Sequence, residues 1–210
     1  MTRCPTPTRA LRDSRGIALV EFAIGLPVFL AAIMGGLELA NFCLMQQRVT
    51  QIASALAMTA ARGSEQIDEA DIHQLMTGVE LSAGGTSIMA NGRVILSSVR
   101  LNAAANGQWI EWQRCDGSRT TASAYGVQGK GKSDATLQTV GGSPGIKAPA
   151  GVDIMVAEAS YAYQPIIGGL FTSFTTGKTL KAVAAHVVRD RTTFGIKNDG
   201  ALSGTALNPC

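Results

Sequence analysis

An apolar run near the start of the chain constrains the fold more than any other feature. The sequence between Ile17 and Leu37 reads IALVEFAIGLPVFLAAIMGGL, and Glu21 is its single charged residue. As a helix this run would be about 31 Å long, which is enough to cross the hydrocarbon core of a bilayer. Composition agrees, because charged residues make up only 16% of the 210 residues and the mean hydropathy is +0.16. The sequence therefore predicts a transmembrane helix, which we place at residues 17–45.

Basic residues before this run predict its orientation. Arg3, Arg9, Arg12 and Arg15 stand against Asp13 alone. By the positive-inside rule, the N-terminus is then cytoplasmic and the rest of the chain lies outside. A cleaved secretory signal has a shorter apolar core of about 7–15 residues followed by a small-residue cleavage site. This run is longer and no A-x-A site follows it, which favours a retained, single-pass anchor.

Glu21 has two interpretations. In the first, its carboxylate reaches toward the cytoplasmic headgroups and favours the positive end of the helix dipole. The second depends on its spacing. If a peptidase cut after Gly16, Glu21 would be the fifth residue of a chain that starts at Ile17. Its carboxylate could then pair with the α-amino group of a neighbouring subunit, so that each buried charge gains a partner.

A basic leader, Gly16, an apolar run and Glu21 at the fifth position resemble a type IV prepilin cleavage motif. The stretch from Arg15 to Gly63 is similar to the TadE/TadG-like family of minor pseudopilins in the tight-adherence (Flp) type IV pilus system. The matching positions are Gly16, Glu21, Phe22, Pro27, Gly36, Glu38 and Ala61 to Gly63. The resemblance implies a protein of the bacterial inner membrane with a small periplasmic or extracellular domain. It also implies removal of the leader, residues 1–16, by a prepilin peptidase, and partners among other pilins, pseudopilins and pilus assembly proteins.

Two further features of the apolar run concern its shape and its packing. Pro27 removes a backbone hydrogen bond and is expected to kink the helix. Ala32, Gly36 and Ala40 recur at four-residue spacing, and small residues on one face let a second helix approach closely. The alternative is that glycine and alanine are simply common in membrane helices.

The helix is expected to continue beyond the apolar run as an amphipathic segment at residues 46–63. Its apolar positions follow a helical period, and polar residues occupy the other faces. The apolar positions are Val49, Ile52, Ala53, Leu56 and Ala60. Gly63 is a natural stop.

An extracytoplasmic α+β domain is expected at residues 64–210, with a small antiparallel sheet packed on the long helix. The expected elements are a helix at residues 68–79 and strands at residues 94–101, 109–115, 152–163 and 180–189. The stretch 126–151 is rich in Gly, Ser, Thr and Lys and predicts a long exposed loop. The tail after Thr192 has a similar composition and is expected to be mobile up to Cys210.

The predicted topology places Cys115 and Cys210 in an oxidising compartment, which favours a disulfide between them over two free thiols. Cys43 lies at the membrane boundary and is expected to be a small apolar residue. Cys4 would leave with the leader if cleavage occurs. No C-x-x-C pair occurs, which argues against zinc sites and thioredoxin-like chemistry.

Little in the sequence points to catalysis or to a cofactor. Residues 126–133 satisfy the P-loop pattern G-x-x-x-x-G-K-[ST], but they lack the buried strand before it and the helix after it that phosphate binding needs. His73 and His186 are the only histidines, and neither belongs to a metal-binding pattern. A net charge of +3 is too weak for nucleic-acid binding without a clustered basic face. We therefore expect no enzymatic activity, no metal, no nucleotide and no cofactor.

Two functions remain open. The first is a pseudopilin-like subunit that works by assembly. The second is an uncleaved bitopic membrane protein whose outer domain binds a partner protein or the cell wall. The N-terminal residue distinguishes them, because processing would leave Ile17 and an uncleaved anchor would keep Met1.

Overall fold

The computed structural model describes residues 16–63, 65–82, 88–141, 144–167, 175, 177–191 and 193–210. Its elements are α2 (Ile17–Ala61), β1 (Ile67–Asp68), α3 (Glu69–Ser82), α4 (Ile88–Asn91), β2 (Gly92–Leu101), β3 (Gln108–Asp116), β4 (Ile154–Ala162), β5 (Thr179–Val187), β6 (Ile196–Lys197) and η2 (Gly204–Leu207). Contacts divide the chain into two units. The first unit is Met1–Phe42 with Pro165–Thr176, and the second unit is Cys43–Gln164 with Gly177–Cys210.

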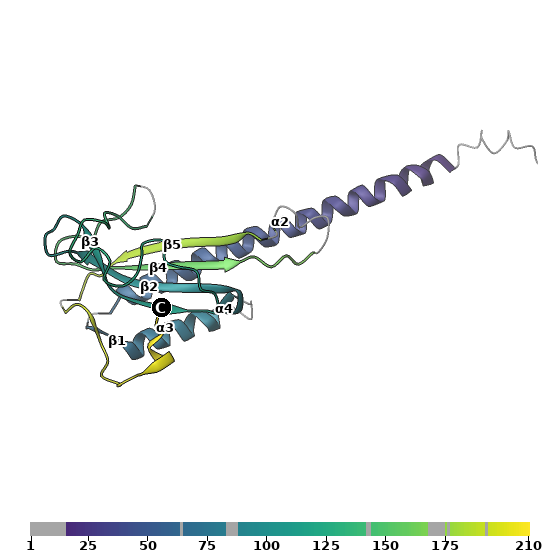
Figure 1. The fold of residues 1–210 in the computed structure, drawn as a ribbon. Coiled ribbons are helices and arrows are strands. Elements are labelled where there is room, and N and C mark those ends of the chain that lie inside the picture. The colour runs from purple at the N-terminus through teal and green to yellow at the C-terminus, as the bar shows by residue number, and fades with distance from the viewer. Residues whose placement is uncertain are drawn as a thin grey trace, which may run out of the picture. The chain divides into compact units, whose positions relative to one another are not determined.

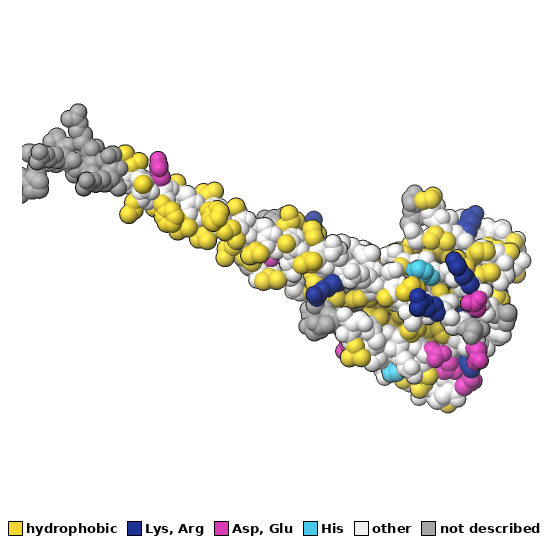
Figure 2. Space-filling view, turned by 180° about the vertical axis from the view of Figure 1, so that it is seen from behind, with side chains coloured by type: hydrophobic (Ala, Val, Ile, Leu, Met, Phe, Trp, Pro, Cys, Tyr) yellow, Lys and Arg dark blue, Asp and Glu magenta, His cyan; other side chains and the backbone are white. Residues whose placement is uncertain are grey.

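Helix α2 changes character along its length. Large apolar side chains are exposed through its first part, where hydrophobic atoms dominate the surface (Figure 2). The helix continues through Pro27 to its end at Ala61, two residues before the expected stop at Gly63. In its last part a stripe at helical spacing is buried. This stripe consists of Met45, Val49, Ile52, Ala53, Leu56, Ala57 and Ala60.

The centre of the second unit is a four-stranded antiparallel sheet with the order β3-β2-β4-β5 (Figure 1). A long apolar helix followed by this small sheet confirms the predicted α+β fold. All four predicted strands are present, and each ends within two residues of its expected bounds. The two central strands, β2 and β4, are far apart in the sequence, with Leu96 opposite Ala157.

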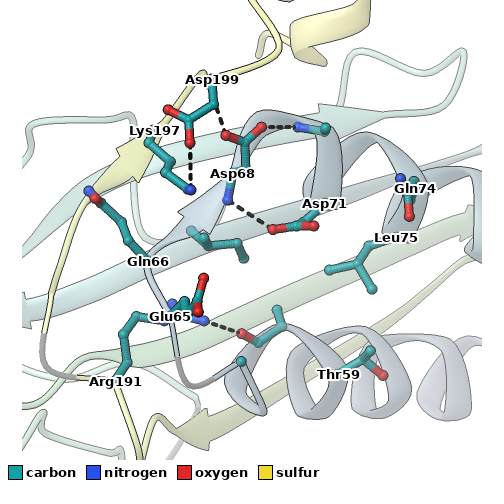
Figure 3. Close-up of a pocket in the computed structure, with 14 residues that line it drawn as sticks. Thr59, Glu65, Gln66, Asp68, Asp71, Gln74, Leu75, Arg191, Lys197 and Asp199 are labelled. Atoms are coloured by element: carbon teal, nitrogen blue, oxygen red, sulfur yellow. Dashed lines mark hydrogen bonds and ion pairs between the residues drawn. The ribbon is translucent and has the colours of Figure 1, made fainter.

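Helices cover one face of this sheet. Leu96, Ala157 and Arg114 are register partners and therefore point to the same face. On that face Arg114 pairs with Glu69 at the start of α3. The last part of α2 lies on the same side of the sheet as α3 (Figure 3). The side-chain amide of its Gln46 donates to the Lys181 carbonyl of β5 at 3.2 Å.

The segment between β3 and β4 covers the opposite face. Its residues Leu137, Val140 and Ala148 are at most 4% exposed and belong to one core cluster with apolar residues of the sheet. Those sheet residues are Val99, Ile110, Ile154 and Val156. The expectation that residues 126–151 form an exposed loop is therefore wrong for these three side chains. They are buried because the second face of the two central strands is also apolar and needs a cover.

The same segment and the chain end occupy the outer edge of β3. The amide of Gln108 donates to the Leu137 carbonyl at 2.7 Å, and the amide of Ile110 donates to the Lys130 carbonyl at 3.0 Å. Farther along, the amide of Cys115 donates to Asn208 at 2.7 Å. These bonds satisfy outward-facing amides that an edge strand would otherwise present to another chain.

The expectation of a mobile tail after Thr192 is also wrong for the residues that the structure describes. In the tail, β6 pairs in parallel with β1, with Ile67 opposite Ile196. The Gln66 side-chain amide donates to the Phe194 carbonyl at 2.9 Å. The tail is held in place because backbone groups of β6 form hydrogen bonds with those of the short β1 strand.

Candidate functional site

The expected cleavage motif lies at the start of α2. Gly16, the first described residue, has 3-10 conformation, and the α-helix begins at Ile17. Glu21 is exposed and lies four residues into the helix, about 6 Å along its axis from Ile17. Residues 1–15 of the expected leader lie outside the described residues. The geometry therefore presents one carboxylate about one helical turn from the expected new N-terminus.

The predicted packing positions share one exposed face of α2. Ala32, Gly36 and Ala40 are all exposed. A Cβ added at Gly36 would meet no atom within 4 Å. Within the described part of the first unit, this face is open to a second helix.

Glu38 has a more specific environment, which sequence reasoning missed. Its side chain is fully buried, at 0% exposed. Oε2 accepts hydrogen bonds from the amides of Ile166 and Ile167, both at 3.1 Å, and Thr175 Oγ1 lies 3.5 Å from Oε1. All of these residues belong to the first unit. One carboxylate therefore fixes a distant stretch of backbone against the helix.

Helical spacing could have revealed Glu38. It lies 7 residues before Met45 and 11 before Val49, on the same stripe that is buried farther along α2. A carboxylate on a buried stripe needs donors.

A groove of about 880 Å³ lies in the second unit, beside the C-terminal end of α2 (Figure 3). Its lining includes several charged residues from α3, β6 and the chain around them. These are Glu65, Asp68, Asp71, Arg191, Lys197 and Asp199.

Polar contacts within the groove tie the tail to α3. Asp68 accepts hydrogen bonds from the amides of Ala70 at 2.8 Å and Asp199 at 2.9 Å, and these bonds hold the pKa of its carboxyl below the ordinary value. Asp199 in turn accepts from Lys197 Nζ at 2.6 Å, which raises the pKa of that ammonium. These contacts hold the tail, at Asp199, against Asp68, which directly precedes α3.

Arg191 lies deeper in the same groove. Its side chain is buried, its Nη2 donates to the Ala60 carbonyl at the end of α2 at 3.1 Å, and its Nε has no hydrogen-bond partner. Burial lowers the pKa of the guanidinium, and the negative charge of Asp153 opposes that shift. Gly63 approaches this group closely, because a Cβ there would lie 3.1 Å from Nη2. Arg191 therefore joins the helix end to the chain that follows β5.

The P-loop-like residues 126–133 lie in the segment between β3 and β4, with no strand or helix directly before or after them among the described residues. Their glycines have a structural explanation. Gly126, Gly129 and Gly131 have positive φ, and a Cβ at Gly131 would lie 2.0 Å from the Gln108 carbonyl oxygen. The pattern thus follows from the close approach of this segment to β3. No group of three or more His, Cys, Asp or Glu side chains that could hold a metal occurs among the described residues.

Cys115 on β3 and Cys210 form a disulfide, with a Cα–Cα distance of 4.9 Å. It joins the tail to the sheet next to the Cys115–Asn208 backbone bond. Cys43 is a free, exposed thiol, and Cys4 lies outside the described residues.

These features define a class of protein. In the described part of the chain, α2 is the one helix whose length and composition suit a membrane crossing, and a small α+β unit follows it. This arrangement indicates single-pass membrane anchoring.

Residues 16–61 match the family model of the TadE-like proteins, which confirms the resemblance to the TadE/TadG-like family. The match suggests a membrane protein associated with the tight-adherence pilus. No curated protein and no solved structure matches the chain.

Proposed function

We propose that the chain is a pseudopilin-like, membrane-anchored subunit of a tight-adherence pilus assembly system. The observation that carries this proposal is that two boundaries fall together at Gly16. The TadE-like match begins at that residue, and α2 begins at the next one, Ile17. In this proposal a prepilin peptidase cleaves after Gly16, removes residues 1–16 and leaves Ile17 with a free α-amino group.

The proposed topology follows the composition of α2. Residues 17–45 cross the bacterial inner membrane with the N-terminus in the cytoplasm. Residues 46–63 continue the helix as an amphipathic segment, and residues 64–210 form the periplasmic or extracellular domain. The exposed apolar surface of the first part of α2 supports this assignment, because such a surface is stable in lipid and costly in water.

Assembly depends on two features of the helix. Glu21 carries a charge that costs up to about 3 kcal/mol at the centre of a bilayer on insertion scales. Pairing with the α-amino group of a neighbouring subunit offsets that cost and sets the stagger between the two helices. The open face at Ala32, Gly36 and Ala40 lets those helices approach closely. The proposed partners are the prepilin peptidase, other pilins or pseudopilins and pilus assembly proteins.

The test is the intact mass and the N-terminal residue of the protein purified from its native membrane without reducing agent. We expect a chain that starts at Ile17, with a mass lower by two hydrogen atoms for the Cys115–Cys210 bond. A chain that starts at Met1 would overturn the pilin mechanism and leave an uncleaved bitopic protein. Cleavage near the end of the apolar run would mean a secreted protein and would overturn the anchor as well.

Two variants separate processing from assembly. Gly16→Phe should block cleavage, because a bulky side chain replaces the residue at the scissile bond. Glu21→Ala should leave cleavage intact and reduce pilus production, and Glu65→Ala, which removes an exposed carboxylate outside α2, serves as its control. Normal cleavage and normal pilus production in both the Gly16→Phe and the Glu21→Ala variants would contradict the mechanism.

A further inference from the structure

The strongest unexplained feature of the first unit is the pairing of Glu38 with the chain around Ile166. Two consecutive amides, of Ile166 and Ile167, donate to the same carboxylate oxygen at 3.1 Å. Charge-assisted bonds of this kind are stronger than neutral ones, and two on adjacent residues fix the local direction of the backbone. The segment Pro165–Ile167 is therefore attached to α2 at one defined level.

The position of that level along α2 is informative. Glu38 is 21 residues from Ile17, about 32 Å along the helix axis, which is close to the thickness of a hydrocarbon core. Its helical neighbours Leu37 and Leu39 are 61% and 53% exposed. The next charged residue is Arg48, ten residues farther on. The exposed apolar surface of α2 thus extends past the Glu38 level.

At this level the attached segment presents an apolar side chain outward. Ile166 is 73% exposed although its amide is bound to a fully buried carboxylate. The backbone bonds account for the attachment, but they do not bury the side chain. An exposed isoleucine is thus held at the level of α2 where Leu37 and Leu39 are also exposed.

We propose that Pro165–Ile167 is a second membrane contact, held by Glu38, whose Ile166 side chain inserts into the lipid interface beside α2. Glu38 has two effects there. It receives its donors from the protein and so needs no water at the edge of the hydrocarbon, and it fixes the depth at which Ile166 enters. The inference rests on the proposed membrane anchoring by α2.

The experiment uses the full chain in vesicles of phosphatidylethanolamine and phosphatidylglycerol. A Cys4→Ser, Cys43→Ser background retains the Cys115–Cys210 disulfide, and a single new cysteine carries an NBD fluorophore. The labelled positions are Ile166→Cys, Leu30→Cys in the apolar part of α2, and Val127→Cys, which is exposed by the same 73% but belongs to the second unit. Quenching is measured with nitroxides placed on lipid headgroups or deep in the acyl chains.

We expect headgroup-level nitroxides to quench the label at position 166 and deep nitroxides to quench the label at position 30. The label at position 127 should remain open to aqueous iodide. If position 30 is quenched by lipid and position 166 behaves like position 127, the inference fails and the anchor stands. If position 30 is not quenched, the proposed anchoring itself fails. A label at 166 that is shielded from both lipid nitroxide and iodide would indicate that another copy or protein covers it, which also overturns the inference.

Variants at position 38 test the role of the carboxylate. Glu38→Gln keeps a carbonyl oxygen that can accept from both amides, whereas Glu38→Ala removes the acceptor. We expect lipid quenching at position 166 to persist in the glutamine variant and to be lost in the alanine variant, with position 30 unchanged in both. Equal quenching at position 166 in all three proteins would show that Glu38 does not set the contact.

Discussion

Glu69 at the start of α3 and Arg114 on β3 form a two-point ion pair that joins the helix to the sheet. Arg114 Nε donates to Glu69 Oε2 at 2.9 Å, and Nη2 donates to Oε1. The side chains are only 5% and 15% exposed. In such a site the loss of one partner leaves an uncompensated buried charge, which costs more than the pair itself contributes.

Glu69→Ala is therefore expected to lower the free energy of unfolding by about 3–5 kcal/mol. The measurement is urea unfolding of the full chain in detergent, followed by circular dichroism. Lys197→Ala is the matched control, because it breaks an ion pair to Asp199 whose side chains are 35% and 69% exposed. That change should cost much less than the loss of Glu69, because exposed ion pairs contribute little to stability. Equal losses in the two variants would contradict the assignment of Glu69 as a structural link.

The disulfide predicts a second stability effect. Cys115 and Cys210 are 95 residues apart, so the bond restricts a long loop in the unfolded chain. Cys210→Ser should lower the free energy of unfolding by up to about 4–5 kcal/mol in the chain-entropy model. Reductant should have the same effect on the parent protein and none on the variant. Cys43→Ser, which removes the exposed free thiol, should leave the unfolding curve unchanged in both conditions.

Asp153 predicts a pH dependence. It is 1% exposed, and burial raises the pKa of its carboxyl to about 6, although Arg100 opposes this shift. The folded state therefore binds this proton more tightly than the unfolded state, whose carboxyl titrates near about 3.9. The contribution of the group to stability is fully present below about pH 4 and is lost as the pH rises to about 6.

Asp153→Asn removes this titration. Relative to that variant, the parent protein should lose on the order of 2 kcal/mol between about pH 4 and pH 6, measured as the difference in unfolding free energy at each pH. Asp134→Asn is the control of opposite sign, because hydrogen bonds from Thr136 lower the pKa of the Asp134 carboxyl. Its contribution is lost as the pH falls. A parent-to-variant difference for Asp153 that stays constant across this range would disprove the assignment.

Gly36 tests the open face of α2. Gly36→Leu should not disturb the isolated fold, because a Cβ there meets nothing within 4 Å. It should weaken helix association in the membrane, measured as energy transfer between labelled copies in vesicles. Met34→Phe adds bulk about 160° away around the helix and is the control. If the two variants associate equally well, the Gly36 face is not the packing surface.

Periodicity explains what the sequence could predict. The stripe of Val49, Ile52 and Leu56 repeats at helical spacing, and the residues of β3 alternate between two faces. Both elements can therefore be predicted from the spacing of apolar residues along the sequence. The apolar run before them is long enough, as a helix, to cross a bilayer by length and composition. These signals are local, and they were sufficient for the helix, the four strands and the α+β class.

The remaining features depend on contacts between distant segments. Leu137 and Val140 are isolated apolar residues in a polar, glycine-rich stretch, and only the uncovered face of the sheet requires their burial. The tail pairs through the two-residue strand β6, which is too short to show any period. Glu38 is an intermediate case. Its place on the buried stripe of α2 follows from helical spacing, but its hydrogen-bond donors, Ile166 and Ile167, lie 128 and 129 residues away in the sequence.

The occupied edge of β3 limits how this sheet can grow. Its outward amides at Gln108, Ile110 and Cys115 are already bonded within the chain, whereas none of the described strands lies beyond β5. A strand from another molecule could therefore join at β5 alone. Growth by strand addition would stop at a closed pair of sheets, because neither copy would have a second free edge. A longer polymer of this chain would therefore need contacts other than strand addition to this sheet.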